Sequence, residues 1–134
     1  MTEALQPYSS SVVALGLLGL LYVAQLVIAD VSGILRKHTP GAPVVGSHDD
    51  FLFRAVRAHA NTTESIGAVI LIAGFAVLRG GDPAWVNGAV WLVLFCRAAH
   101  TLSYYLDLRP IRSVAFAVGI VALVALFSVG LQGP

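Results

Sequence analysis

Charge is scarce in this sequence. Lysine, arginine, aspartate and glutamate make up 11% of the 134 residues, whereas a soluble globular domain carries about 25%. Hydrophobic residues make up 57% and the mean hydropathy is +0.84, so the chain cannot cover a soluble domain with solvated side chains. The single cysteine, Cys96, excludes a disulfide scaffold, and 6 prolines among so many apolar residues exclude collagen-like and disordered chains. A net charge of +1 leaves no basic surface for nucleic acid.

The sequence contains four long runs without a charged residue. A helix crosses a bilayer with about 20 apolar residues. Positions 4–29 form an uncharged run of 26 residues, and positions 113–134 form one of 22. Two further runs, 65–78 and 83–96, have 14 residues each, and they reach spanning length only if their helices continue through charged residues. The sequence therefore predicts an all-α integral membrane protein, one domain over 1–134, with four transmembrane helices at about 8–35, 50–79, 83–106 and 110–131.

Turn residues separate these four helices. The segment 38–50 is rich in glycine, proline and aspartate and is predicted to be a loop. In Gly80-Gly81-Asp82-Pro83, Asp82 is the expected N-cap and Pro83 occupies the favoured first helical position. Asp107-Leu108-Arg109-Pro110 separates the third helix from the fourth.

The basic residues predict how the chain is oriented. Six of them flank the first and third connections, whereas only Arg79 flanks the second. The six are Arg36, Lys37, Arg54, Arg57, Arg109 and Arg112. Because cytoplasmic loops carry the excess of lysine and arginine, the 38–50 and 107–110 connections are expected in the cytoplasm and both termini outside.

Ionisable residues inside spanning helices are costly in lipid and are functional candidates by default. At about 100° per residue, four polar residues of the second helix fall within an arc of about 80°: Arg54, Arg57, Asn61 and Glu64. Arg97, His100 and Tyr104 form a similar stripe on the third helix, and Arg112, Ser113 and Phe116 lie on one side of the fourth. These stripes must face one another or a neighbouring subunit, since lipid cannot solvate them.

The groups in the stripes are mostly cationic. Up to four arginines accompany one carboxylate, Glu64. Arginine binds carboxylates in a bidentate manner, and a lone carboxylate suits an ammonium group, so the set fits a ligand with several carboxylates and one amine. The alternative is that the same groups pair with one another and only fasten the helices together.

The polar residues form three motifs in order along the chain. The first is Arg54-x-x-Arg57-Ala-His59-x-Asn61-x-x-Glu64, the second is Arg97-x-x-His100-x-x-x-Tyr104 and the third is Pro110-x-Arg112-Ser113. Together they resemble the motifs of the family of membrane-associated proteins in eicosanoid and glutathione metabolism (MAPEG), and most of all those of its microsomal glutathione S-transferase members. The resemblance implies a homotrimer that binds glutathione between subunits near the cytoplasmic face. Glutathione has two carboxylates and one ammonium group, as the residue set requires.

The resemblance also implies a role for each residue. Glutathione-binding positions of the family fall on Arg57, Asn61, Glu64, Arg97, His100 and Tyr104. The arginine beside the glutathione thiol matches Arg112, and its neighbour matches Ser113, so these two are the expected catalytic residues.

Three departures from the family pattern narrow the expected activity. Phe116 replaces a tyrosine of the isomerase branch, Ala60 replaces an arginine found in several members, and the arginine that often ends the first helix has only Val31, Ser32 or the later Arg36 as candidates. These departures favour a transferase or peroxidase that joins glutathione to lipophilic electrophiles or reduces lipid hydroperoxides. The alternative is a non-catalytic lipid-binding or scaffold protein of the same fold.

Several other residues carry weaker expectations. Cys96 and His59 are expected to be packing residues, and no spacing resembles a metal site. Asp30 either pairs with an arginine of the stripes or reaches the interface. Tyr8 and Trp85 are expected to anchor the chain at the outer interface. Four glycines are expected to let helices approach closely: Gly16, Gly19, Gly67 and Gly74.

Overall fold

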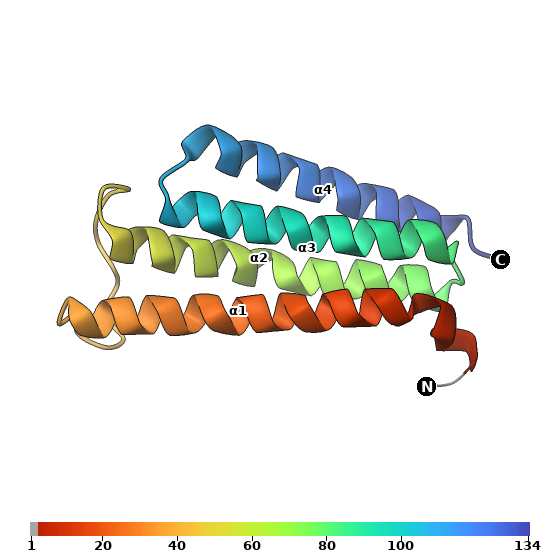
Figure 1. Cartoon of the computed structure of the whole chain (residues 1–134), viewed down its shortest axis with the longest axis horizontal. Coiled ribbons are helices and arrows are strands. Elements are labelled where there is room, and N and C mark those ends of the chain that lie inside the picture. Colours follow the sequence, from red (N-terminus) through yellow and green to blue (C-terminus); the bar gives the residue numbers. More distant parts are fainter. Residues whose placement is uncertain (1–2) are drawn as a thin grey trace.

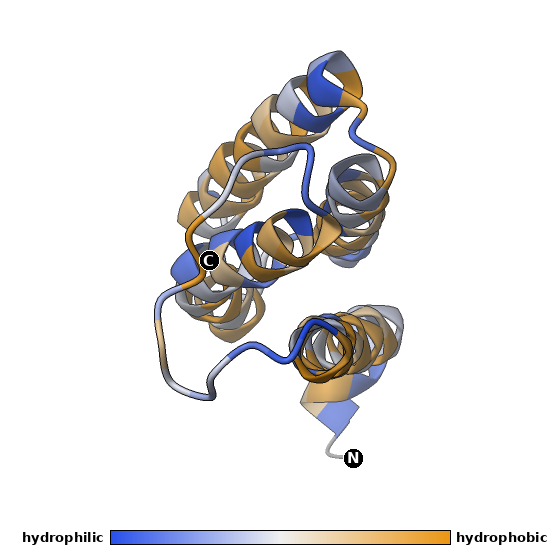
Figure 2. Ribbon diagram, turned by 90° about the vertical axis from the view of Figure 1, so that its left-hand side faces the viewer, coloured by the Kyte–Doolittle hydropathy of each residue, from blue (hydrophilic) through white to orange (hydrophobic). Residues whose placement is uncertain are grey.

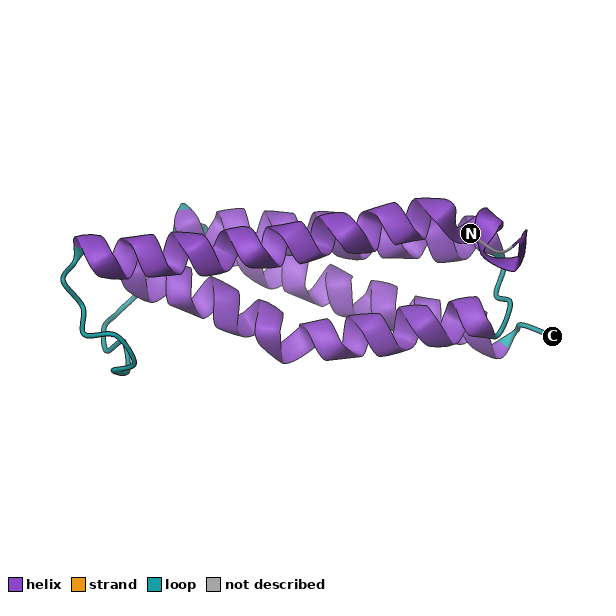
Figure 3. Ribbon diagram, turned by 90° about the horizontal axis from the view of Figure 1, so that it is seen from below, coloured by secondary structure: helices purple, strands orange, loops and turns teal. Residues whose placement is uncertain are grey.

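The computed structural model describes residues 3–134 and consists of helices and their connections (Figure 3). A short 3-10 helix, η1 (Glu3–Tyr8), leads into α1 (Ser9–Leu35). The other helices are α2 (Phe51–Leu78), α3 (Pro83–Tyr105) and α4 (Arg109–Leu131). The predicted four-helix architecture is confirmed, and each of the four helices begins and ends within one residue of the expected position.

Side-chain caps fix the beginnings of two helices. The Asp82 carboxylate accepts hydrogen bonds from the backbone N–H groups of Ala84 and Trp85, at 2.9 and 3.2 Å, and Pro83 occupies the first turn. Asp50 caps α2 in the same way by accepting from Leu52 N at 3.0 Å. These caps satisfy N–H groups that have no partner within the helix, so each connection ends at a defined residue.

The helices lie side by side and alternate in direction (Figure 1). Both termini and the α2–α3 turn lie at one end of the bundle, and the α1–α2 loop and the α3–α4 turn lie at the other. This alternation brings the first part of α2, the last part of α3 and the first part of α4 to the loop end. The three polar stripes therefore share one end of the molecule.

The third helix packs against α1, α2 and α4, and α2 likewise contacts the other three helices. Ten of its 23 residues are buried, including Arg97, His100 and Tyr104. By length and composition alone, three segments could cross a membrane: Glu3–Leu35, Phe51–Leu78 and Arg109–Leu131. The third helix falls short because its polar residues lower its hydropathy, and its neighbours shield those residues from lipid. The chain is an integral membrane protein.

The end of the bundle that holds the termini has an apolar interior. Its buried cluster includes Leu18, Val69, Val90 and Leu126. Large apolar side chains also cover the outside of the helices, among them Leu71 at 75% exposure. Viewed from the loop end, hydrophilic residues gather on the connections while the helix surfaces behind them are mostly hydrophobic (Figure 2). This distribution suits a bundle whose outer surface contacts lipid or another subunit.

The four predicted close-contact glycines do not pack against other helices within the chain. A Cβ at Gly16, Gly19, Gly67 or Gly74 would meet nothing within 4 Å. The close approach occurs at Gly130, where a Cβ would lie 2.6 Å from Phe75 Cε1 on α2. Sequence spacing does not distinguish a glycine that faces a neighbouring helix from one that faces outward, because that choice depends on how each helix is rotated.

The expectation for Tyr8 is wrong. Its side chain is 5% exposed, and its hydroxyl donates a hydrogen bond to the Gly81 carbonyl at 2.6 Å. The residue fastens the start of α1 to the α2–α3 turn, which offers a free carbonyl at the same end of the bundle. Trp85, by contrast, is 71% exposed.

Candidate functional site

The polar stripes of α2 and α3 meet in a direct hydrogen bond. Arg97 Nη1 on α3 donates to Asn61 Oδ1 on α2 at 2.9 Å. Arg97 is 2% exposed, so its charge lies inside the bundle, where an unpaired ion would be costly. Its guanidinium also lies over the Phe116 ring of α4, 5.5 Å from the centroid. Residues of three helices thus converge on one cation.

His100 and Tyr104 continue the buried face of α3 toward the loop end. Their exposed fractions are 3% and 7%, and their rings meet edge to face with centroids 5.1 Å apart. His100 also lies against Phe116, with ring centroids 6.0 Å apart. The contact between His100 and Tyr104 is a ring contact without a hydrogen bond, and together with Phe116 it fills the space between α3 and α4.

The guanidinium of Arg112 lies over the face of Tyr104, with Cζ 4.5 Å from the ring centroid. Its Nη1 lies 3.4 Å from Nδ1 of His48 in the α1–α2 loop. None of the described residues forms an ion pair with Arg112, since the two ion pairs found in residues 3–134 are Arg36–Asp50 and Asp107–Arg109. Its positive charge is therefore oriented by an aromatic face and an imidazole without being neutralised.

Five residues from the three stripes line one small cavity of about 210 Å³: Asn61, His100, Arg112, Ser113 and Phe116. Ligand pockets usually have volumes of about 300–1,000 Å³, so this cavity is smaller than an ordinary ligand pocket. Two buried donor or acceptor atoms of this region, Arg97 Nη2 and His100 Nδ1, have no hydrogen-bond partner in the described chain. Unsatisfied buried polar atoms of this kind call for a ligand, a water or a residue of another subunit.

Arg57 and Glu64 share the arc of Asn61 but do not join the cavity. Both side chains are exposed, and neither makes a hydrogen bond or an ion pair within residues 3–134. The structure thus brings together Asn61, Arg97, His100, Tyr104, Arg112 and Ser113, and leaves Arg57 and Glu64 on the adjoining surface. Glu64 therefore neutralises no arginine of its own chain. Of the pairing that would only fasten the helices together, the structure shows the Asn61–Arg97 bond.

Sequence reasoning missed His48. It lies in a loop without periodicity, so no pattern in the sequence connects it to a helix that begins only at Arg109. Arg54 does join the site region: its guanidinium donates to the carbonyl of His48 and, at 3.4 Å, to that of Tyr105. Two of the candidates near the end of α1 lie elsewhere, since Arg36 pairs with Asp50 at 3.5 Å and Ser32 donates to Ile28 O of its own helix.

Two residues of α1, Gln25 and Tyr22, contact the neighbouring helices close to the site. Gln25 is fully buried and donates to Thr101, which in turn donates to the Arg97 carbonyl at 2.7 Å. The His59 ring stacks on Tyr22, with centroids 4.7 Å apart, and Cys96 is buried. His59 and Cys96 are packing residues in this chain, as the sequence predicts.

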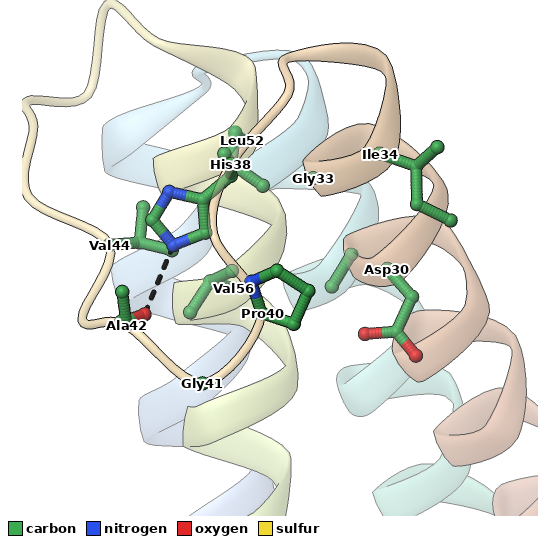
Figure 4. A pocket seen from close by; sticks show the side chains of 11 residues that line it. Asp30, Gly33, Ile34, His38, Pro40, Gly41, Ala42, Val44, Leu52 and Val56 are labelled. Carbon is green, nitrogen blue, oxygen red and sulfur yellow. Dashed lines mark hydrogen bonds between the residues drawn. The ribbon is translucent and has the colours of Figure 1, made fainter.

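A larger cavity, of about 460 Å³, lies between α1, the loop and the start of α2, and contains none of the predicted site residues (Figure 4). Its walls are mostly apolar and include Leu52 and Val56 of α2. Within the loop, His38 Nε2 contacts the Ala42 carbonyl at 3.0 Å. Asp30 reaches the rim of this cavity, is exposed and pairs with no arginine of the stripes. The interfacial alternative for Asp30 therefore fits the structure.

Comparison with known proteins identifies the family of the chain. The chain is 32% identical over 111 residues to human prostaglandin E synthase, an alignment that covers 72% of this chain and 72% of that protein. The model of the MAPEG family matches residues 9–131, which include all four helices and every residue of the candidate site on them. The chain belongs to the MAPEG family.

Proposed function

We propose that the protein is a membrane-bound, glutathione-dependent transferase with peroxidase activity. It conjugates lipophilic electrophiles or reduces lipid hydroperoxides by means of a glutathione thiolate. The relative named above makes prostaglandin E, and its family contains glutathione-dependent enzymes. The proposal rests on the residues of this chain together with that membership.

One observation carries the proposal: the site has arginine cations and a buried polar atom that the described chain itself does not satisfy. Arg112 has no carboxylate partner among the described residues. Arg97 Nη2 and His100 Nδ1 have no hydrogen-bond partner there either, and the nearby Arg57 is exposed. A ligand with two carboxylates would supply acceptors to these groups, and Glu64 offers a counter-charge for its ammonium group.

In this proposal the residues divide into two groups. Arg57, Asn61, Glu64, Arg97, His100 and Tyr104 hold the glutathione backbone, whereas Arg112 and Ser113 act at its sulfur. A thiol with a pKa near 8.5 is mostly protonated at neutral pH. Lowering that pKa by two units requires about 2.7 kcal/mol, which one guanidinium can supply in a site of low dielectric constant. The Ser113 side chain is exposed at the cavity. Its hydroxyl donates to the Arg109 carbonyl of its own helix at 3.3 Å and would turn from there to donate to the thiolate.

Two features favour a homotrimeric enzyme with its site at the cytoplasmic face. The cavity of one chain is smaller than an ordinary ligand pocket, and Arg57 and Glu64 lie on the surface next to it, where a second subunit could complete the site. The loop end of the bundle also carries most of the basic residues, and an excess of basic residues is typical of a cytoplasmic side. This distribution supports a proposed orientation with both termini outside.

The residue at position 116 favours transfer or reduction over isomerisation. Phe116 lines the cavity beside Arg112 and Ser113, and a phenyl ring cannot donate a proton or a hydrogen bond. The acceptor substrate would enter from the bilayer, because apolar side chains cover the outside of α4, such as Val121 at 67% exposure. Lipophilic haloarenes, unsaturated carbonyl compounds and lipid hydroperoxides have the required chemistry.

The test is rapid-mixing ultraviolet spectroscopy of thiolate formation when glutathione is added to the purified protein. The wild type should show thiolate absorbance, and Arg112→Ala should lose it together with most of the conjugation rate, with a smaller change in glutathione affinity. Arg79→Ala, at the opposite end of the bundle, is the control and should behave as wild type. If Arg112→Ala left thiolate formation intact while Arg36→Ala removed it, Arg112 would not be the activating residue.

A further inference from the structure

The α1–α2 loop places one side chain directly against Arg112. His48 Nδ1 lies 3.4 Å from Arg112 Nη1, and the His48 ring lies 6.0 Å, centroid to centroid, from the Tyr104 ring on which Arg112 rests. The guanidinium is thus held between an aromatic face of α3 and an imidazole of the loop. His48 is the one described loop residue with a polar side-chain contact to Arg112.

His48 is itself held in place from two sides. Arg54 donates to its backbone carbonyl, and its ring meets Phe53 edge to face, with centroids 5.3 Å apart. The side chain is half-buried. A residue fixed by its backbone and by both ring neighbours can hold a partner in one orientation, whereas a free loop side chain cannot.

An imidazole is well suited to orient Arg112 without weakening it. A carboxylate in the same place would neutralise the guanidinium and reduce its attraction for an anion. A neutral imidazole with its proton on Nε2 offers the Nδ1 lone pair, so it can accept a hydrogen bond and leave the positive charge available to the cavity.

We propose that His48 is a positioning residue for Arg112. It accepts a hydrogen bond from the guanidinium, holds it over Tyr104 and keeps its charge directed to the cavity beside Ser113. This inference rests on the proposed function, in which Arg112 stabilises the glutathione thiolate.

The experiment measures thiolate absorbance of the glutathione complex against pH, together with glutathione affinity, in the full-length protein. His48→Ala should reduce the bound thiolate at neutral pH by about two- to tenfold, as expected for one hydrogen bond, with less than a twofold change in affinity. His48→Asn keeps an acceptor that does not titrate. It should restore most of the thiolate absorbance at neutral pH, because the amide oxygen can accept from the guanidinium in place of Nδ1.

The matched control is His38→Ala, another loop histidine, whose ring contacts the Ala42 carbonyl and not Arg112; its profile should match the wild type. A His48→Ala variant with wild-type thiolate, or one with more thiolate than the wild type, would overturn the positioning role. If Arg112→Ala loses the thiolate while His48→Ala keeps it, this inference alone fails. If Arg112→Ala keeps the thiolate, the proposed function fails.

Discussion

The Asn61 side chain on α2 accepts a hydrogen bond from the buried guanidinium of Arg97 on α3, and the two are 36 residues apart in the chain. The bond joins two polar stripes that must each be hidden from lipid. It also holds Asn61 at the cavity, between α3 and the residues of α4 that line it.

Removing the amide should therefore destabilise the bundle. Asn61→Leu leaves the Arg97 guanidinium, which is 2% exposed, without its acceptor, and this should cost about 1–3 kcal/mol. Thermal unfolding in mild detergent measures the loss. Ser128→Ala is the control, because that hydroxyl is exposed and bonds only to its own helix. Equal stability of the two variants would show that the Asn61–Arg97 bond does not hold α2 and α3 together.

Glu64 should contribute to the affinity for glutathione and not to thiolate formation. Glu64→Gln removes the carboxylate proposed to bind the ligand's ammonium group, and glutathione binding should weaken by about 1.5–3 kcal/mol, while saturating glutathione still gives thiolate absorbance. Isothermal titration calorimetry measures the affinity. Asp49→Asn, an exposed loop substitution, should leave it unchanged. Wild-type affinity in Glu64→Gln would remove Glu64 from the site.

A single added methyl group at Gly130 should separate α4 from α2. The Cβ of Gly130→Ala would lie 2.6 Å from a Phe75 ring carbon and 3.0 Å from the Ala76 backbone, and such overpacking costs about 1–3 kcal/mol. Gly88→Ala is the matched control, since its Cβ would meet nothing within 4 Å and alanine favours a helix over glycine by about 1 kcal/mol. The midpoint of thermal unfolding should be lower for Gly130→Ala than for the wild type, and equal or higher for Gly88→Ala.

The assembly is expected to be a homotrimer. Native mass spectrometry in mild detergent should show three copies of the 14.1 kDa chain, because the exposed Arg57 and Glu64 need a neighbouring surface. A stable monomer that binds glutathione with full affinity would contradict a site completed by a second subunit.

Orientation can be measured by labelling from each side of the membrane. Tags at either terminus should react only from outside, and a cysteine placed at Ser47 in a Cys96→Ser background should react only from the cytoplasm. Ser47 is suitable because it is exposed in the α1–α2 loop. Labelling of one terminus from the cytoplasm would contradict the proposed orientation.

The sequence by itself determined the four helices, their approximate ends and most residues of the candidate site. Uncharged runs of spanning length can form little except helices in lipid, and residues three and four apart necessarily share a helix face. Asp82 and Pro83 mark the start of α3 through purely local bonding. The MAPEG resemblance also depends on linear spacing, so the order of the residues is sufficient to reveal it.

Only the tertiary structure decided how the helices are rotated and what the loop contacts. Periodicity places Arg57, Asn61 and Glu64 on one arc, but packing turns Asn61 toward Arg97 and leaves the other two exposed. The glycine contacts differ for the same reason, with Gly130 close to Phe75 and Gly67 in open space. His48 reaches Arg112 across 64 positions of the chain, and a contact between an aperiodic loop and a distant helix arises only when the whole bundle has packed.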